Sequence, residues 1–257
     1  MYSFVYDDLV ILFGPKRTTH MITLKKDGKF FTSNGVLMHN DIVAVNSGSI
    51  VKTDKRIPYT VFKPTYKDFV MNIKRKAQII YPKDTAIMLM WGDVYPGLEI
   101  LESGVGQGAL SIALLRALAG NGNLVSYEIR DDFAEQAGNF ISEFSGETAN
   151  HKIVKGDIYD GFEGVYDRVF LDLAEPWNVV KFTKDGLKSG GIIVAYIPTI
   201  LQVKTYVDTL KEAGYFTEIE IFENIKRPWK VDGLSVRPES WMYNHSAFIV
   251  SSRKISI

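Results

Sequence analysis

From Leu98 onward the chain alternates short apolar runs, typical of β-strands, with longer runs of helical periodicity. This alternation predicts a mostly parallel sheet covered by helices on both faces. The last two strands have no helix between them, so we expect them to pair antiparallel. The predicted class is therefore α/β with a seven-stranded sheet. Its strands are expected at 98–103, 124–129, 151–154, 168–173, 191–197, 216–222 and 246–251, and its helices at 109–119, 131–144, 179–187 and 201–213.

The first 62 residues have a different rhythm. Short β-rich runs are separated by turn signals, and Asp27-Gly28 and Asn34-Gly35 are dipeptides that favour tight hairpins. A small N-terminal β-barrel or sandwich is expected, and residues 63–97 are interpreted as a linker with helices. The predicted domains are thus 1–62, 63–97 and 98–257. Expected strands lie at 9–13, 20–24, 29–32 and 42–45, and the linker helices at 66–78 and 85–91.

Charge is distributed unevenly along the chain. The total is balanced, with 30 Lys and Arg against 30 Asp and Glu. Residues 1–76 nevertheless carry 13 basic and 6 acidic residues, an excess of seven positive charges, and the remainder carries the opposite excess. A basic N-terminal part beside an acidic body indicates a localised anion-binding face, with chance clustering on solvated loops as the alternative.

Composition excludes several classes of chemistry. The chain has no cysteine, which rules out disulfides, thiolate nucleophiles and cysteine-bound zinc. Its four histidines are scattered without metal-ligand spacing, so no metal site is expected. No apolar run is long enough to span a membrane and the first residues do not resemble a signal peptide, so a cytoplasmic protein is expected.

The segment LESGVGQGAL, residues 101–110, joins the first strand of the sheet to a helix. Gly104, Gly106 and Gly108 would let the backbone turn sharply and approach a ligand closely. Glu128 ends the next strand, where a carboxylate can bind both hydroxyls of a ribose. The pair predicts a cofactor that contains adenosine. Because the loop also satisfies the loose dinucleotide pattern, a nicotinamide enzyme remains an alternative at this point.

Two further strand ends carry acidic residues. Asp157 follows the third strand, where it could accept a hydrogen bond from an adenine amino group. Asp172 lies in LDLAEPW at the end of the fourth strand, and an acidic residue followed by proline and an aromatic is typical of methyltransferases that act on nitrogen. A helix N-cap is the alternative role for Asp172. For Pro176 and Trp177 a simple turn is equally consistent with the pattern.

These motifs together resemble the tRNA (adenine-58-N1)-methyltransferases in their archaeal and bacterial form. The resemblance covers nearly the whole chain: RKAQIIYPKD at 75–84, then LESGVGQGAL, SYEIR, LDLAEPW and YIPTILQV in order, and NHSAFIVSSRK near the end. It implies a Rossmann-like class I domain that transfers a methyl group from S-adenosylmethionine to adenine 58 in the T-loop of tRNA. It also implies a homotetramer, and leaves open whether adenine 57 is modified too.

The resemblance also implies roles for individual residues. Asp172 would be the catalytic aspartate beside the transferred methyl group, and Tyr81 and Tyr196 would help to place the target adenine. The cofactor would be held by Ile80, Gly104, Gly106, Gln107, Gly108, Ala109, Glu128, Phe133, Asp157, Ile158 and Asp172. Two departures stand out: Gln107 occupies a position where serine is frequent, and Asn244 replaces the usual glycine before His245.

Two other functions fit parts of the pattern. A methyltransferase for a small molecule or for isoaspartate would explain the cofactor motifs, but neither the basic N-terminal part nor LDLAEPW. A catalytically inactive tRNA-binding subunit would be expected to have lost its glycines or its aspartate, yet Gly104, Glu128 and Asp172 are all present.

Overall fold

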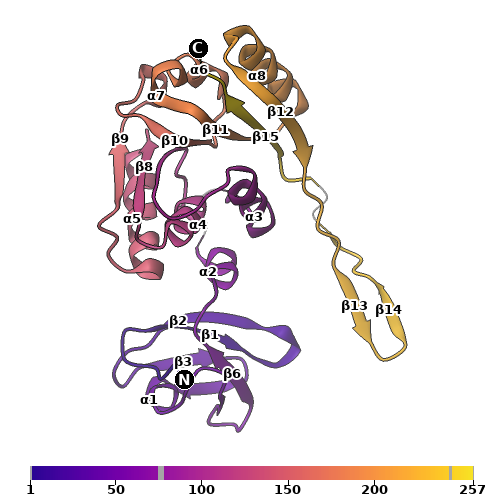
Figure 1. Cartoon of the computed structure of the whole chain (residues 1–257). Coiled ribbons are helices and arrows are strands. Elements are labelled where there is room, and N and C mark those ends of the chain that lie inside the picture. Colours follow the sequence, from indigo (N-terminus) through magenta and orange to yellow (C-terminus); the bar gives the residue numbers. More distant parts are fainter. Residues whose placement is uncertain (1, 75–77, 243–244, 257) are drawn as a thin grey trace. The chain divides into compact units, whose positions relative to one another are not determined.

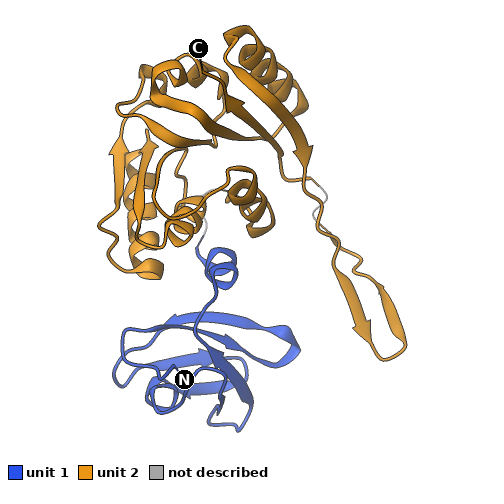
Figure 2. Cartoon of the chain, viewed as in Figure 1, with its two compact units in different colours: residues 1–74 blue, residues 75–257 orange. Residues whose placement is uncertain are grey.

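The computed structural model describes residues 2–74, 78–242 and 245–256 (Figure 1). The chain divides into two compact units, Met1–Lys74 and Arg75–Ile257 (Figure 2). Helix α2 (Tyr66–Asn72) therefore belongs to the first unit and helix α3 (Pro82–Trp91) to the second. The helix expected over 66–78 ends at Asn72, and its expected residues 75–77 lie outside the described part of the chain.

Unit 1 is a small antiparallel β domain, as expected. One sheet has the strand order β2-β1-β6-β5, and a separate hairpin joins β3 to β4. Gly35, which follows the hairpin turn, has a φ of 112°, a value that favours glycine. The core beneath the sheet contains Val10, Leu12 and Tyr59. The strands are β1 (Leu9–Phe13), β2 (Thr19–Thr23), β3 (Lys29–Thr32), β4 (Gly35–Met38), β5 (Ile50–Lys52) and β6 (Pro58–Phe62), and η1 (Pro15–Arg17) is a short 3-10 turn.

The strand predicted over 42–45 is wrong. Ile42 lies in helix α1 (His39–Val43), with its side chain fully buried. The β-branched residues favour a strand locally, but long-range contacts fix the helix. The ring Nδ1 of His39 accepts a hydrogen bond from the backbone of Lys25, and the side chain of Asn40 accepts one from Asp27.

Unit 2 contains the predicted seven-stranded sheet, in the order β12-β15-β11-β10-β7-β8-β9 (Figure 1). Strand β15 runs antiparallel to both β11 and β12, and the other neighbouring pairs are parallel. The α/β class and the antiparallel pairing of the last two predicted strands are thus confirmed. The bounds are β7 (Leu98–Ser103), β8 (Gly122–Glu128), β9 (His151–Lys155), β10 (Tyr166–Leu171), β11 (Leu187–Ile197), β12 (Phe216–Glu223) and β15 (Phe248–Lys254).

Helices cover both faces of this sheet, and consecutive residues of β7 point to opposite faces. Leu101 packs into a core cluster with helix α8 (Ile200–Ala213). Glu102, the next residue, turns the other way and accepts a hydrogen bond from Ser111 on helix α4 (Ala109–Leu118). Helices α3 and α5 (Asp131–Ser145) contact α4, whereas α6 (Trp177–Val180) contacts α8 and α7 (Thr183–Gly186).

Two features of unit 2 differ from the prediction. The helix expected over 179–187 is divided into α6 and α7, and at the break the backbone N–H of Phe182 donates to the carbonyl of Val179, three residues back rather than four. Lys254 on β15 donates hydrogen bonds to the carbonyls of Thr183, Lys184 and Leu187, at and just beyond α7. The segment between β12 and β15 also forms an unpredicted hairpin, β13 (Trp229–Asp232) and β14 (Ser235–Pro238). Figure 1 shows this hairpin extending away from the central sheet.

Candidate active site

The ends of β7 and β10 bring two predicted motifs together. The strands are paired in register Ser103–Leu171, and the backbone of Asp172 donates a hydrogen bond to the carbonyl of Ser103 over 2.9 Å. The order of the strands reverses here, since β8 lies on one side of β7 and β10 on the other. Such a reversal leaves a crevice at the carboxyl ends of the strands. The pocket in this crevice is lined by Gln78, Ile79, Ile80, Gly104, Val105, Gly106, Gln107, Ala109, Leu110 and Asp172.

The glycines of the loop have distinct physical roles. Gly104 has a φ of 85°, and a Cβ atom there would overlap the carbonyl oxygen of Asp172. A side chain at this position would therefore separate the two motifs. Gly106 has a φ of 53° and open space where its Cβ would lie, and Gly108 has a φ of 76° at the start of α4. The loop thus leaves its backbone accessible to a ligand.

Glu128 at the end of β8 is joined directly to this loop. Its Oε2 accepts a hydrogen bond from the backbone N–H of Gly106 over 3.1 Å, and its Oε1 accepts one from Arg130 over 3.0 Å. The side chain is 7% exposed. The carboxylate is therefore held in place by backbone donors, with lone pairs left for further donors such as hydroxyl groups.

Three carboxyl groups gather in this region: Glu102, Glu128 and Asp172. The side chain of Asp172 is exposed and opens into the pocket, but the protein packed around its carboxyl group keeps much of the water away and raises its pKa to about 7, with a further contribution from the charge of Glu128. Burial also raises the pKa of Glu102 to about 7, although hydrogen bonds from Ser126 and Ser111 oppose the shift. An electronegative crevice of this kind favours a ligand with positive charge.

The side-chain amide of Gln107 also indicates that a ligand binds in this pocket. It is 2% exposed, yet neither its nitrogen nor its oxygen has a hydrogen-bond partner among the described residues. Buried polar groups of this kind are normally satisfied, so an unpaired amide on a pocket wall calls for a polar ligand. The residues therefore fit a cofactor that combines hydroxyl groups with a cationic centre.

The three residues expected at the adenosine end, Phe133, Asp157 and Ile158, do not line this pocket. Asp157 follows β9, and its Oδ1 accepts a hydrogen bond from the backbone of Tyr159, which caps the short turn η2 (Ile158–Asp160). Ile158 is buried. Phe133 on α5 is also buried, and the guanidinium carbon of Arg130 lies 3.8 Å from the centre of its ring.

The two expected aromatics lie on different elements. Tyr196 is in β11, where the register Leu171–Ala195 makes it the neighbour of Asp172 across the β10–β11 pair. Its hydroxyl donates to Asp84 Oδ2 over 3.3 Å. Burial raises its pKa, and the charges of Asp84 and Asp172 add to this shift. Tyr81 is half-buried and is the N-cap residue of α3, next to Ile80 on the pocket wall.

A buried polar network beside Tyr196 was not predicted. Lys83 Nζ lies 2.7 Å from Asp84 Oδ1 and 2.7 Å from Ser246 Oγ, and Ser246 Oγ lies 2.7 Å from Asp84 Oδ2. Both Lys83 and Asp84 fall within RKAQIIYPKD, and Ser246 within NHSAFIVSSRK. The residues of this network thus lie within the sequence motifs, but only the folded structure shows that the two motifs contact each other. Residues 75–77 and Asn244 of these motifs lie outside the described residues.

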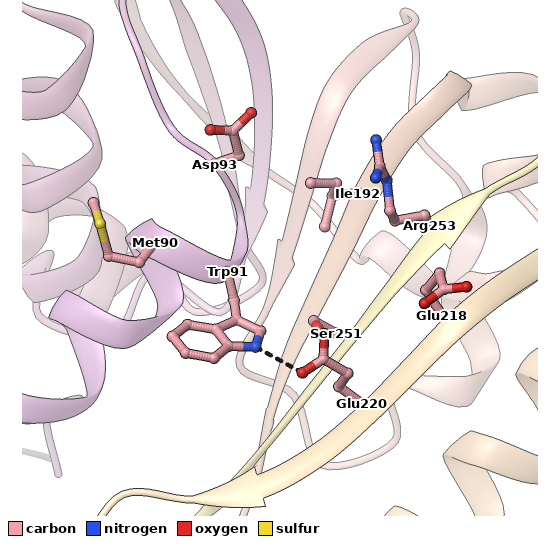
Figure 3. Close-up of a pocket in the computed structure, with 8 residues that line it drawn as sticks. All are labelled: Met90, Trp91, Asp93, Ile192, Glu218, Glu220, Ser251 and Arg253. Carbon is pink, nitrogen blue, oxygen red and sulfur yellow. Dashed lines mark hydrogen bonds between the residues drawn. The ribbon is translucent and has the colours of Figure 1, made fainter.

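A second pocket lies between α3 and the β11–β15–β12 part of the sheet, and no predicted site residue lines it (Figure 3). Trp91 Nε1 donates to Glu220 Oε2 over 3.1 Å across this pocket. Within the described ranges, no group of three or more His, Asp or Glu side chains could hold a metal ion. Nor does any helix there have the length and apolar character needed to cross a membrane.

Comparison with known proteins places the chain in a family. The model of the tRNA methyltransferase complex GCD14 subunit matches residues 59–247, and the TrmI-like N-terminal model matches residues 3–51. The chain is 31% identical to the tRNA (adenine(58)-N(1))-methyltransferase TrmI of Thermus thermophilus, with 95% of this chain and 96% of the relative covered. It is also 31% identical to the TrmI of Methanocaldococcus jannaschii, named for adenines 57 and 58, with 90% of each chain covered.

Solved structures agree with this placement. A protein from Thermotoga maritima, described as an S-adenosylmethionine-dependent O-methyltransferase, has a TM-score of 0.95 and 31% identity, covering 99% of this chain and 96% of its own. The tRNA (m1A58) methyltransferase TrmI of Aquifex aeolicus has a TM-score of 0.86 and 25% identity, covering 99% and 100%. The strand-end site and these matches together show that the chain belongs to the tRNA (adenine-58-N1)-methyltransferase family.

Proposed function

We propose that this protein transfers a methyl group from S-adenosylmethionine to N1 of adenine 58 in the T-loop of tRNA. The observation that carries the proposal is the position of Asp172, which lies against the glycine loop and beside Tyr196 in one crevice. The family assignment supplies the class of substrate. We expect the enzyme to act in the cytoplasm, where tRNA is available.

The cofactor site follows from the same crevice. Glu128 would accept hydrogen bonds from the ribose hydroxyls, while the loop backbone and Gln107 would contact the amino-acid end. Asp157 would accept a hydrogen bond from the adenine amino group, and the apolar side chains would pack against the ring. The full proposed set is Ile80, Gly104, Gly106, Gln107, Gly108, Ala109, Glu128, Phe133, Asp157, Ile158 and Asp172.

The residues then act mainly by alignment and electrostatics. The sulfonium of the bound cofactor supplies an electrophilic methyl group, so the protein needs chiefly to align the acceptor with it. Adenine N1 has an in-plane lone pair and needs no prior deprotonation. Asp172 would accept a hydrogen bond from the exocyclic N6–H, stabilise the positive charge that develops on the base, and take the N6 proton that then leaves.

The target atom lies on the pairing edge of the base, so the adenine has to leave its stack. Extrusion costs on the order of a few kcal/mol. Contact with aromatic side chains can offset part of that cost, and we assign this role to Tyr81 and Tyr196. Tyr196 is well placed for it, because it neighbours Asp172 across the β10–β11 pair.

Unit 1 would supply most of the attraction to tRNA phosphates. Residues 1–76 carry the excess of seven positive charges, and the rest of the chain is acidic. Electrostatic contact with phosphates provides much of the affinity of proteins for nucleic acids. The proposed contacts are drawn from Lys16, Arg17, Lys25, Lys26, Lys29, Lys52, Lys55 and Arg56.

We also propose a homotetramer, on the basis of the family resemblance and of the β13–β14 hairpin. Trp229, Val231 and Leu234 on this hairpin are 59%, 73% and 105% exposed. An isolated two-stranded hairpin is marginally stable in water, so apolar side chains on it favour a protein partner. Light scattering coupled to gel filtration tests the assembly. A monomer, or a tetramer that persists after Leu234→Lys and Val231→Lys, would contradict the role of the hairpin.

Nucleoside mass spectrometry tests the activity itself. Unmodified tRNA incubated with the protein and S-adenosylmethionine should gain 1-methyladenosine, and a tRNA with guanosine at position 58 should not. Product on that second tRNA would indicate activity at position 57, which the name of the Methanocaldococcus relative includes. The Thermotoga structure raises O-methylation as a second function. A 2′-O-methylated nucleoside without 1-methyladenosine would favour it.

A further inference from the structure

Lys83 and Asp84 form an ion pair in an unusual setting. They are consecutive residues at the start of α3, and their side chains are 11% and 0% exposed. Neighbouring positions on a helix do not normally face each other. A buried pair is weak evidence for stability, because removing two charges from water opposes their attraction. A function that requires a fixed geometry would explain why such a pair is kept.

The ammonium of Lys83 holds both ends of one segment. It donates to the carbonyl of Asn224 over 2.6 Å and to Ser246 Oγ over 2.7 Å. Asn224 returns a hydrogen bond from its side-chain amide to the carbonyl of Lys83 over 2.7 Å. Asn224 directly follows β12 and Ser246 shortly precedes β15, so the segment that carries the β13–β14 hairpin is fastened at its two roots.

The carboxylate of Asp84 connects this fastening to the acceptor side of the active site. Its Oδ2 accepts hydrogen bonds from Ser246 Oγ over 2.7 Å and from the hydroxyl of Tyr196 over 3.3 Å. Tyr196 in turn neighbours Asp172 across the β10–β11 pair. A chain of contacts thus runs from the hairpin roots through Lys83 and Asp84 to the aromatic beside the catalytic aspartate.

We propose that Lys83 and Asp84 are positioning residues, which fix Tyr196 beside Asp172 and tie it to both roots of the hairpin segment. The proposal rests on the proposed function, because it assumes that Tyr196 contacts the acceptor base. Buried polar networks that are fully satisfied select one arrangement of their members. Removal of the pair therefore releases the tyrosine hydroxyl and the hairpin roots together, without touching the cofactor loop.

The test is a double-mutant cycle. The variant Lys83→Met/Asp84→Leu removes both charges and the carboxylate acceptor at once, so no unpaired charge is buried. Turnover at saturating tRNA and cofactor should fall about tenfold, and Tyr196→Phe should cause a similar decrease. The triple variant should be no worse than the more impaired parent. Affinity for S-adenosylhomocysteine, measured by calorimetry, should stay within about twofold throughout. Asp208→Asn, which breaks an exposed ion pair with Lys204, is the matched control and should change nothing.

A spectroscopic readout separates positioning from mere stability. In protein labelled with ¹³C at tyrosine Cζ, the resonance that disappears in Tyr196→Phe is that of Tyr196, and it should shift in the pair variant. If the pair variant does not fold, Ser246→Ala removes one hydrogen bond to Asp84 and should produce the same shift with a smaller decrease in turnover. Additive effects in the cycle, a parallel decrease in cofactor affinity, or an unmoved resonance would each overturn the proposal.

This design also separates the two hypotheses. Wild-type protein that binds S-adenosylhomocysteine but does not methylate tRNA would refute the proposed function alone. The tyrosine resonance would still report whether the pair fixes Tyr196.

Discussion

The backbone N–H of Gly106 lies 3.1 Å from Glu128 Oε2, which joins the glycine loop to the end of the next strand. We expect Glu128→Ala to weaken the binding of S-adenosylmethionine by roughly 1.5–3 kcal/mol, the usual value of a hydrogen bond to a charged group. Glu128→Gln keeps an acceptor without the charge and should lose less affinity. Calorimetry measures both, with circular dichroism to show that the variants are folded. Equal affinity in Glu128→Ala and wild type would refute the ribose role.

Asp172→Ala should nearly abolish methyl transfer, since the base would lose its N6 hydrogen-bond acceptor, while cofactor affinity stays within a few-fold. Single-turnover kinetics at saturating cofactor and tRNA give the rate of the chemical step. Glu175→Ala, in the same motif but on an exposed side chain, is the control. A decrease of less than tenfold in Asp172→Ala would show that this aspartate has no catalytic role.

The rate should depend on pH through the same residue. Partial desolvation by the surrounding protein raises the pKa of Asp172 to about 7 in the free enzyme, and a protonated carboxyl group cannot accept the N6 proton. The value of kcat/KM should therefore fall about tenfold per pH unit below pH 7 and level off above it. Glu102→Gln, which removes the other carboxyl with a pKa of about 7, should keep this acidic limb. A flat profile from pH 5.5 to 8.5 would contradict the assignment.

Glu102 should make the folded protein less stable at alkaline pH. Its pKa rises from 4.5 to about 7 on folding, so the folded state binds more protons between these values and stability falls as pH rises through that range. The cost above pH 7 is on the order of 3 kcal/mol. Glu102→Gln should therefore melt at a higher temperature than wild type at pH 8, with a smaller difference at pH 5. The exposed Glu147→Gln is the control. A lower melting temperature for Glu102→Gln at pH 8 would refute this account.

The basic unit should account for most of the affinity for tRNA. A chain shortened to residues 75–257 should bind S-adenosylhomocysteine normally, which also shows that it is folded, and tRNA much more weakly. Removing one ionic interaction with a phosphate should flatten the slope of log affinity against log salt by about 0.7–0.9. In the full chain, replacing the exposed Lys52, Lys55 and Arg56 by alanine should produce part of this change. An unchanged salt slope in both proteins would place the tRNA site elsewhere.

Local sequence patterns were sufficient for the elements whose residues all favour one structure. The buried run of β7 and the amphipathic pattern of α5 were predicted nearly to the residue, because periodicity and turn signals agreed there. The same held for the loop at 104–108, since glycine spacing reports directly on backbone conformation. The prediction was wrong where contacts with residues distant in the sequence outweighed the local preference. Ile42 lies in a helix that is fixed by contacts with Lys25 and Asp27, and not in a strand.

The amino-acid sequence by itself therefore determined the α/β class, the family resemblance and the identity of the residues at the strand ends. Only the tertiary structure decided which of them meet. Asp84 is separated from Tyr196 by 112 residues and from Ser246 by 162, and no local periodicity connects such positions. The raised pKa of Asp172 likewise depends on the protein packed around its carboxyl group and on Glu128, two strands away in the sheet. Hydrogen bonds and pKa values depend on distance and solvent exposure, and these are properties of the folded chain alone.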